Sequence, residues 1–336
     1  MCALRLKILV PELNQFSLPR NPNLLSVGFD VGGTNIRGLS LGNDGGATEL
    51  YQRQHLGNLE LIVDSVVEIS TQMQISSGKK IGSIGVGCAG LVDKEGVVIT
   101  SPNIQTIEKF PLRKEIQERM QVAVVVENDA NCAAWAEAQL GVAKGKKDLI
   151  VVSFGTGIGA GILLNGQLHK GISGYAGEVG HMVIEREGLP CPCGKQGCWE
   201  QYASGSALGR LANQMQREGL IGEIEFGLVT EGNPLSSEAV GAAVQGDDPE
   251  AIKVLSIYSE FVSMGLHNLT KMIDPEMIVL SGGITEIGSP FLEAIKQSYY
   301  QITDTQPNSE KTEIALARFG NKAGSVGAAI FGNQIM

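Results

Sequence analysis

Apolar residues form short alternating or continuous segments in the first part of the chain, which predicts β-strands. LLSVGFDV (24–31) predicts an apolar strand, and GGTN predicts a turn. IRGLSL (36–41) predicts a second strand that runs back, with apolar residues in alternation. NDGG (43–46) is a turn signal before a third strand at 47–56. Apolar residues from Leu59 to Met73 then recur at helical spacing, and Asn58 is the expected N-cap.

Strands and helices alternate through the rest of the chain. The pattern predicts strands within 83–93, 122–128, 277–284 and 313–320, and helices at 112–120, 130–140, 201–219, 249–273, 290–302 and 322–334. Asp248 followed by Pro249 predicts a helix start, and Asp274-Pro275 its end. Residues 219–247 are polar and glycine-rich and predict a peripheral segment. This alternation is typical of the α/β class.

The opening pattern occurs twice. Residues 149–168 again read as strand, glycine turn, strand, Asn-Gly hairpin and strand. When the two copies are superposed in sequence, Ser153 falls on Asp30, Gly155 on Gly32 and Gly161 on Gly38. We infer an internal duplication, although glycine-rich hairpins are common by themselves.

Composition and charge narrow the classes of protein. The 336 residues, 43% of them hydrophobic, suffice for two domains with full cores. The net charge of −10 argues against a nucleic-acid-binding face. No apolar run approaches a membrane span, and residues 1–23, read as an N-terminal extension, lack the apolar core of a signal peptide. We therefore expect a cytoplasmic protein with no membrane or nucleic-acid partner.

Three of the six cysteines cluster in EVGHMVIEREGLPCPCGKQGCWE (178–200), which predicts a metal site. Zinc prefers Cys and His in closed tetrahedral sites, and His181, Cys191, Cys193 and Cys198 supply one such set. A closed set leaves no open ligand position, so the predicted Zn²⁺ is structural. Ordinary buried cysteines beside a stray histidine are the alternative. The cluster and the otherwise sparse cysteines argue for intracellular thiols rather than a disulfide framework.

Two glycine turns at strand ends predict a phosphate-binding site. DVGGTN (30–35) places a carboxylate beside glycines and a hydroxyl. A carboxylate cannot bind phosphate by itself, so we expect Asp30 to hold Mg²⁺ near the phosphates. FGTGIGAG (154–161) repeats the turn without the acid, and SGGI (281–284) adds a third. Two such turns, one with a metal ligand, suit a nucleoside triphosphate, and no GxxxxGK[ST] motif is present. The expected nucleotide contacts are Asp30, Gly32, Gly33, Thr34, Asn35, Gly155, Thr156, Gly157, Gly282 and Gly283.

Asn128-Asp129 ends a buried strand where a helix begins, and two interpretations of Asp129 are open. Asp129 is either a helix N-cap or a general base that accepts a proton from a hydroxyl attacking the γ-phosphate. Hydroxyl-binding side chains for a sugar are available at Asn103, Asn128, Glu178 and Glu200. Each glutamate alone could equally be a solvated surface acid.

These motifs resemble the ROK family of sugar kinases and repressors, within the actin-like ATPase superfamily. The matching segments are FDVGGTNIRG, GVGCAGLVD, VENDANCAAWAE, SFGTGIGAGI, GEVGHM, CPCGKQGCWEQYASG and VLSGGI, and they extend over about 25–332. The resemblance implies two actin-like (ribonuclease H-like) domains with a cleft between them. We expect the first at 24–130 plus 323–336 and the second at 131–322, with the zinc loop at 181–198.

The resemblance also implies an ATP-dependent hexose kinase that phosphorylates the 6-hydroxyl. Asp129 becomes the base, and the sugar contacts are Asn103, Asn128, Asp129, Glu178, His181 and Glu200. His181 would touch the sugar through one ring nitrogen and zinc through the other. Closure on the sugar would limit wasteful hydrolysis of ATP. Dimers or tetramers are frequent in the family.

The identity of the sugar is open. Many kinases of the family have Pro-Gly where Cys88-Ala89-Gly90 stands here, in a segment that shapes the sugar pocket. We expect glucose, with N-acetylmannosamine or N-acetylglucosamine as alternatives. A sugar-responsive repressor is the alternative outside enzymes, but residues 1–24 are too short and Pro-broken for a helix-turn-helix domain.

Overall fold

The computed structural model describes residues 4–6, 23–33, 35–41, 50–55, 57–101, 108–224, 234–303 and 312–334. The chain forms two compact units. The first comprises Met1–Gly145, Leu168–Ala176 and Lys322–Met336, and the second Lys146–Gln167 and Gly177–Asn321. No helix in the described ranges is long and apolar enough to cross a membrane.

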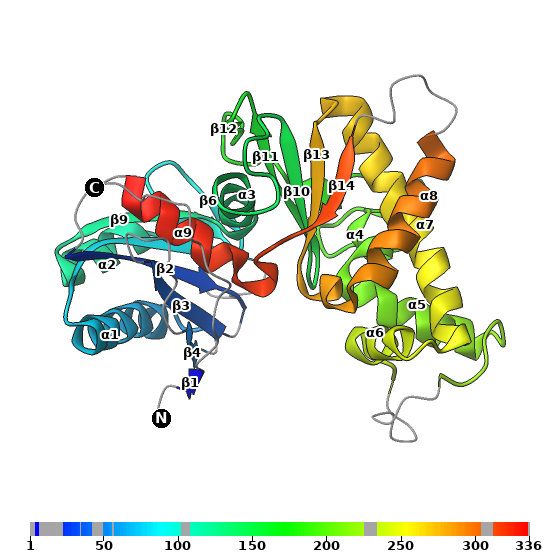
Figure 1. The fold of residues 1–336 in the computed structure, drawn as a ribbon, viewed down its shortest axis with the longest axis horizontal. Helices are drawn as coiled ribbons and strands as arrows, with labels where there is room; N and C mark the ends of the chain where they lie inside the picture. Colours follow the sequence, from blue (N-terminus) through cyan, green and yellow to red (C-terminus); the bar gives the residue numbers. More distant parts are fainter. Residues whose placement is uncertain are drawn as a thin grey trace. The chain divides into compact units, whose positions relative to one another are not determined.

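The first unit is built on a six-stranded sheet of order β1-β4-β3-β2-β5-β9. Its strands are β1 (Leu4–Leu6), β2 (Leu24–Val31), β3 (Asn35–Leu41), β4 (Leu50–Gln54), β5 (Lys80–Cys88) and β9 (Ala123–Asn128). Two helices cover one face, α1 (Leu59–Ser77) and α2 (Leu112–Met120); α3 (Asp129–Gln139) and α9 (Ala323–Gln334) lie on the other (Figure 1). Both faces are therefore covered, which explains the continuous apolar runs of β2 and β5.

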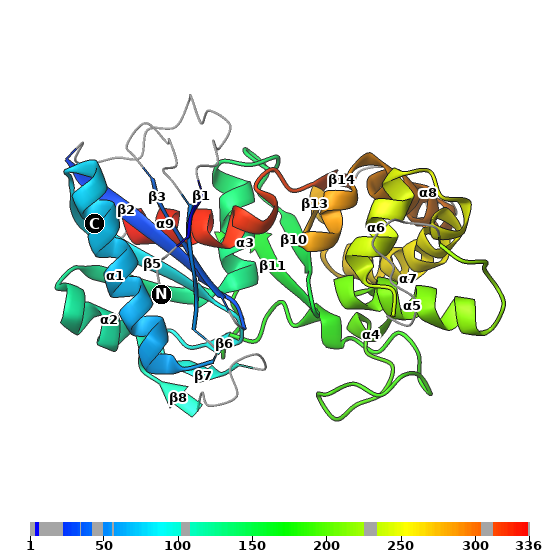
Figure 2. The same ribbon diagram turned by 90° about the horizontal axis from the view of Figure 1, so that it is seen from below.

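Helix α9 lies against β2 and β5 because small residues allow a close approach. A Cβ added at Gly85 would lie 1.7 Å from the carbonyl oxygen of Ala328, so only glycine fits there. A smaller sheet of β6 (Leu91–Val92), β7 (Val98–Thr100) and β8 (Glu108–Phe110) belongs to the same unit (Figure 2).

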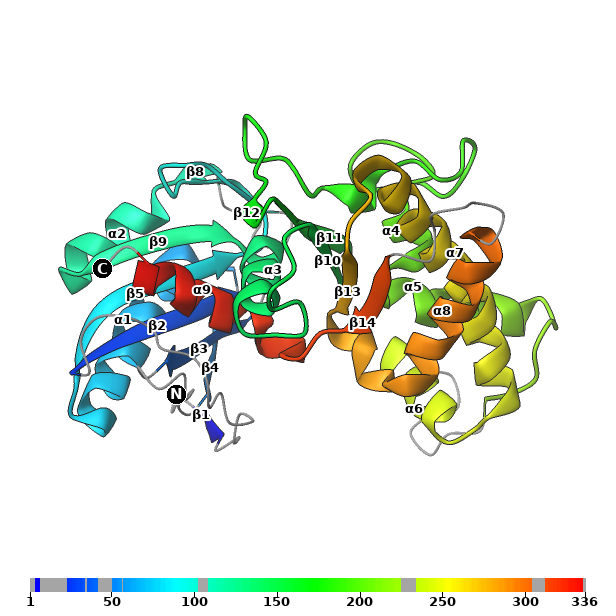
Figure 3. The ribbon, with the colours of Figure 1, turned by 45° about the horizontal axis from the view of Figure 1, so that its top comes forward.

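The second unit has a five-stranded sheet of order β12-β11-β10-β13-β14. Its strands are β10 (Leu149–Phe154), β11 (Ile158–Leu164), β12 (Gln167–Leu168), β13 (Met277–Ser281) and β14 (Glu313–Leu316). Five helices gather on one side of this sheet (Figure 3): α4 (Glu200–Ala203), α5 (Gly205–Arg217), α6 (Ser237–Gln245), α7 (Pro249–Ile273) and α8 (Ser289–Thr303). Short 3₁₀ turns are η1 (Val179–His181), η2 (Gly283–Ile287) and η4 (Gly320–Lys322).

Strand pairing bears out the inferred duplication. In the first unit β2 pairs antiparallel with β3 and parallel with β5, and β5 pairs parallel with β9. In the second unit β10 pairs in the same way with β11 and β13, and β13 with β14. The turns differ in length. Val31 pairs with Ile36, whereas Phe154 pairs with Ile158, so the second turn is one residue shorter. The expected match of Gly161 with Gly38 is therefore wrong by one position, and Ala160 takes that place.

Helix boundaries follow local chemistry closely. Asn58 Oδ1 accepts the N–H groups of Glu60 (2.9 Å) and Leu61 (3.2 Å), which confirms the predicted cap of α1. Asp248 caps α7 in the same way, and the helix ends at Asp274 with a positive φ of 52°.

Three features were not foreseen. The N-terminal extension contributes β1, which pairs antiparallel with β4. The segment 219–247 contains α6, whose Val240 and Val244 are buried in the core of the second unit. Helix α3 packs with α9, and residues through Gly145 belong to the first unit, whereas we expected that unit to end near residue 130.

Candidate active site

The first glycine turn follows β2 and has Asp30 at its entrance. Asp30 pairs with Arg37 of β3 on one side and with Gly87 of β5 on the other. Desolvation is the main cause that raises the pKa of Asp30 to about 7; the charge of Asp129 adds to the rise and Arg37 opposes it. A carboxyl group with this pKa is partly protonated at neutral pH, and a bound cation would favour its ionised form.

The β9–α3 corner carries Asn128 and Asp129. Asn128 is the N-cap: its Oδ1 accepts the Asn131 N–H at 3.1 Å, and its Nδ2 donates to the Gly90 carbonyl at 3.0 Å. Asp129 is the first helical residue, and its Oδ1 accepts the Ala130 N–H at 2.9 Å. The capping interpretation of Asp129 is therefore wrong, because Asn128 caps the helix.

Asp129 lies near enough to Asp30 for its charge to raise the pKa of Asp30. Desolvation raises the pKa of Asp129, and hydrogen bonds from backbone N–H groups partly oppose the rise. The two acids lie at the carboxyl ends of β2 and β9, which flank β5 in the sheet. This edge of an open α/β sheet is where ligands bind. A carboxylate with a raised pKa is also a better proton acceptor.

Glu127 and Lys170 support this corner, and neither was predicted from the sequence. Glu127 is 5% exposed; its Oε1 accepts the Asn128 N–H and the Asn131 side-chain amide, each at 3.0 Å. Its Oε2 forms an ion pair with Lys170. A glutamate inside the apolar run of β9 was the available signal, because a buried carboxylate needs a charged partner.

The second glycine turn opens onto a pocket of about 640 Å³. Gly155 and Thr156 line it together with Gly205 and Ser206 at the start of α5, and with Gly283. The expected Gly157 and Gly282 do not line this pocket. A Cβ at Gly282 would lie 2.3 Å from the Phe154 carbonyl oxygen, and its φ is 97°, so glycine lets η2 begin directly against the turn.

The expected metal ligands come together in the second unit. Ligand atoms of His181, Cys191, Cys193 and Cys198 all lie within 4.8 Å of one another. This donor set fits a tetrahedral zinc ion. Desolvation raises the pKa of the Cys191 thiol to about 12, so a metal ion has to displace its proton on binding.

His181 lies between the cysteines and an acid. Its Nδ1 is 3.7 Å from Cys191 Sγ and 3.5 Å from Glu200 Oε1, whereas its Nε2 is 3.9 Å from Glu178 Oε2. Nδ1 thus faces Cys191 and Glu200, and Nε2 faces Glu178; the Cys191 thiol also donates to Glu200 Oε1 at 3.1 Å. The Glu200 carboxylate also approaches the second turn, because a Cβ on Gly157 would lie 2.5 Å from its Oε2.

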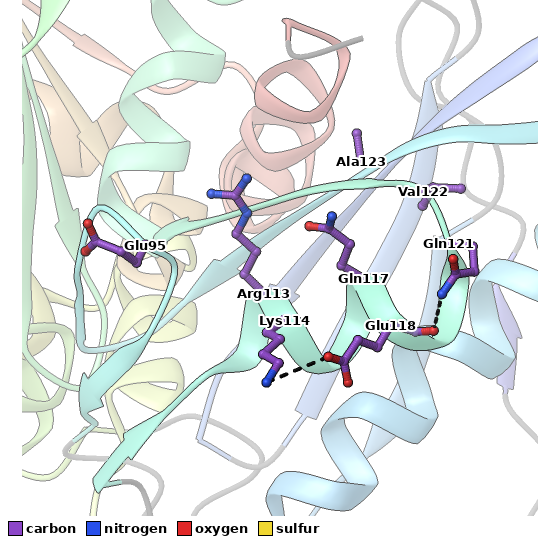
Figure 4. A pocket seen from close by; sticks show the side chains of 8 residues that line it. All are labelled: Glu95, Arg113, Lys114, Gln117, Glu118, Gln121, Val122 and Ala123. Carbon is purple, nitrogen blue, oxygen red and sulfur yellow. Dashed lines mark hydrogen bonds and ion pairs between the residues drawn. The ribbon is translucent and has the colours of Figure 1, made fainter.

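A second pocket, of about 680 Å³, lies along α2 in the first unit and contains none of the expected residues. Figure 4 shows its charged lining, with Arg113 and Lys114 beside Glu95 and Glu118. Lys114 pairs with Glu118 at 3.7 Å within the helix. Of the other expected residues, Gly32 and Gly33 lie in the first turn and Asn35 is the first residue of β3. Thr34 and Asn103 lie outside the described residues.

Comparison with known proteins places these features in a family. The model of the ROK family matches residues 26–335. The chain is 33% identical over 308 residues to a glucokinase of Streptomyces coelicolor, covering 91% of this chain and 96% of that protein. It is also 33% identical over 267 residues to a xylose repressor of Bacillus subtilis, covering 78% of this chain and 65% of the repressor.

A solved structure is similar over nearly the full length. A ROK family glucokinase from Streptomyces griseus, crystallised with glucose and AMPPNP, superposes with a TM-score of 0.80 at 32% identity, covering 92% of this chain and 99% of that one. The expected fold of two actin-like domains is thus confirmed. With its duplicated sheets and glycine turns, the chain belongs to the ROK family.

Proposed function

We propose that this chain is an ATP-dependent sugar kinase that transfers the γ-phosphate of MgATP to the 6-hydroxyl of glucose. The observation that carries the proposal is the proximity of Asp129 to Asp30 beside the first glycine turn: Asp30 pairs with Gly87, and a Cβ added at Gly87 would lie 3.6 Å from the Asp129 Cα. Asp30 would hold a metal ion, and Asp129 would accept the proton of a hydroxyl group. Glucokinases among the relatives, and the glucose and AMPPNP bound to the similar Streptomyces griseus structure, support this choice of substrates.

Residues of the first unit would bind the metal ion and accept the proton of the attacking hydroxyl. Phosphoryl transfer requires chiefly positioning and charge stabilisation. Mg²⁺, held by Asp30 directly or through water, would neutralise phosphate charge when bound. Asp129 accepts the proton of the attacking hydroxyl, and its raised pKa suits that role. Asn128 keeps a second Nδ2 hydrogen for a sugar hydroxyl, and Asn103 is a further sugar contact in this proposal.

Residues of the second unit would hold nucleotide and sugar. Gly155, Thr156 and Gly283 line a pocket of suitable size for a nucleoside, about 640 Å³. Glu178, His181 and Glu200 are the proposed hydroxyl ligands of the sugar. Zinc bound by the three cysteines and His181 Nδ1 would fix the ring of this histidine, leaving Nε2 for the sugar.

The test of this proposal is Asp129→Asn, assayed by ADP release with glucose. Loss of the base should lower kcat about 10²- to 10⁴-fold while the affinity for glucose, measured calorimetrically, stays within about threefold. Asp247→Asn is the matched control, because Asp247 is exposed and its positive φ of 59° suits asparagine. Near wild-type turnover of Asp129→Asn would refute the assignment of the base.

The same assay decides between the alternatives. We expect kcat/KM to be highest for glucose in a panel with mannose, fructose, N-acetylglucosamine and N-acetylmannosamine. Because a xylose repressor is among the relatives, a gel-shift assay with operator-like DNA should accompany it. DNA binding without sugar-dependent ADP release would favour a repressor.

A further inference from the structure

A buried histidine contacts the first glycine turn. His55 follows β4 directly and is 0% exposed. Its Nε2 lies 2.8 Å from the carbonyl oxygen of Gly32, and its Nδ1 lies 3.1 Å from the backbone nitrogen of Gly57. The Gly57 N–H donates to Nδ1, so the ring proton resides on Nε2, which donates to the Gly32 carbonyl.

The surroundings keep this ring neutral. Desolvation lowers the pKa of His55, and the backbone of Gly32 and Asn35 only partly opposes the effect. The ring therefore has one fixed tautomer, a donor toward Gly32 and an acceptor toward Gly57. Such a side chain can set the direction of the carbonyl that it contacts.

The direction of the Gly32 carbonyl determines that of the next N–H. The described peptide bonds are all trans, and in a trans peptide the C=O and the following N–H point in opposite directions. Because the Gly32 carbonyl points at His55, the Gly33 N–H points away from it. Gly33 is partly exposed, and in the part of the chain that the structure describes its N–H has no hydrogen-bond partner.

We propose that His55 is a positioning residue for the nucleotide: it orients the Gly32–Gly33 peptide so that the Gly33 N–H donates to a phosphate oxygen. This inference rests on the proposed kinase function and deepens it. Successive backbone N–H groups in a turn bind anions only when they converge, so a free peptide that could flip would bind phosphate less well. Among the described residues no histidine is hydrogen-bonded to the other turn, although each turn is closed in the same way: the Gly32 N–H donates to the Asn35 carbonyl and the Gly155 N–H to the Gly157 carbonyl, each at 3.0 Å.

The proposal differs from a purely structural role in one measurable respect. A histidine that only satisfies a buried carbonyl would affect stability and all ligands alike. A histidine that orients a phosphate donor should affect ligands that carry phosphate and leave the bare nucleoside unchanged.

The experiment compares His55→Gln with His55→Asn in the full chain, with MgATP, MgADP and adenosine as calorimetric probes. The Gln amide reaches the position of Nε2 and can still donate to Gly32, whereas the Asn amide is too short. We expect His55→Asn to weaken MgATP binding about tenfold, His55→Gln to stay within about threefold of wild type, and adenosine affinity to be equal in all three. His267→Asn is the control, since among the described residues the His267 Nδ1 has no hydrogen-bond partner.

The outcomes are separable from those of the proposed function. Equal MgATP affinity of the Asn, Gln and wild-type proteins would overturn the role of His55 even if all three phosphorylate glucose. A parallel loss of adenosine affinity would also overturn it, in favour of a structural role. Absence of sugar-dependent ADP release by the wild-type protein would instead refute the kinase assignment.

Discussion

The two units share one strand order apart from β1, yet the residues around their glycine turns differ. The first turn follows Asp30, is longer by one residue and contacts buried His55. The second follows Ser153 and lines a pocket, and each turn is closed by a hydrogen bond from the N–H of its first glycine. In the proposed function, the duplicated fold would supply two anion-binding turns, with metal and proton chemistry at the first and enclosure of the ligand at the second.

Removing the acid of the first turn should produce the largest difference in activity between the two turns. Asp30→Asn eliminates the proposed Mg²⁺ ligand, and we expect kcat to fall about 10²- to 10³-fold. Ser153→Ala, at the equivalent position of the second turn, should change kcat less than about threefold. Steady-state kinetics at saturating glucose and MgATP measure both. Equal losses in the two variants would mean that the turns are not functionally different.

Loss of the metal should act on the sugar and not on the nucleotide. Cys193→Ser removes one proposed zinc ligand, and we expect glucose affinity to fall about 10- to 100-fold while MgADP affinity stays within about twofold. Zinc content from elemental analysis and affinities from calorimetry check this prediction. Lys195→Ala, in the same loop with all thiols retained, is the control. Unchanged glucose affinity in a zinc-free variant would show that the metal does not support the sugar site.

Asp30 should also make stability depend on pH. Its pKa is 3.8 in the unfolded reference and about 7 in the folded protein, so between these values the folded state binds more protons. The contribution of Asp30 to the free energy of unfolding is therefore most favourable below about pH 4 and becomes less favourable as the pH rises toward 7.

We expect Asp30→Asn to be more stable than the wild type by about 4 kcal/mol at pH 8, with the difference becoming small near pH 4. Urea unfolding without Mg²⁺ or nucleotide measures it, and Asp247→Asn is the control. Parallel stability curves for wild type and Asp30→Asn would contradict the raised pKa.

The sequence predicted the repeated strand pattern and the clustering of His181 with the cysteines, because both follow from local spacing. It did not predict contacts that depend on distant segments. Glu127 meets Lys170, and His55 meets Gly32, only once the chain has folded, and a lone histidine at a strand end carries no local signal. Helix α6 was missed because its segment is polar and glycine-rich, although Val240 and Val244 are buried.

The central claim is that the chain transfers phosphate from ATP to the 6-hydroxyl of glucose. Phosphorus and proton NMR of the product formed by the wild-type protein with glucose and MgATP tests it most directly. We predict a single phosphomonoester, glucose 6-phosphate, formed in equal amount with ADP. Phosphate at another position, or release of inorganic phosphate with glucose unchanged, would contradict the account.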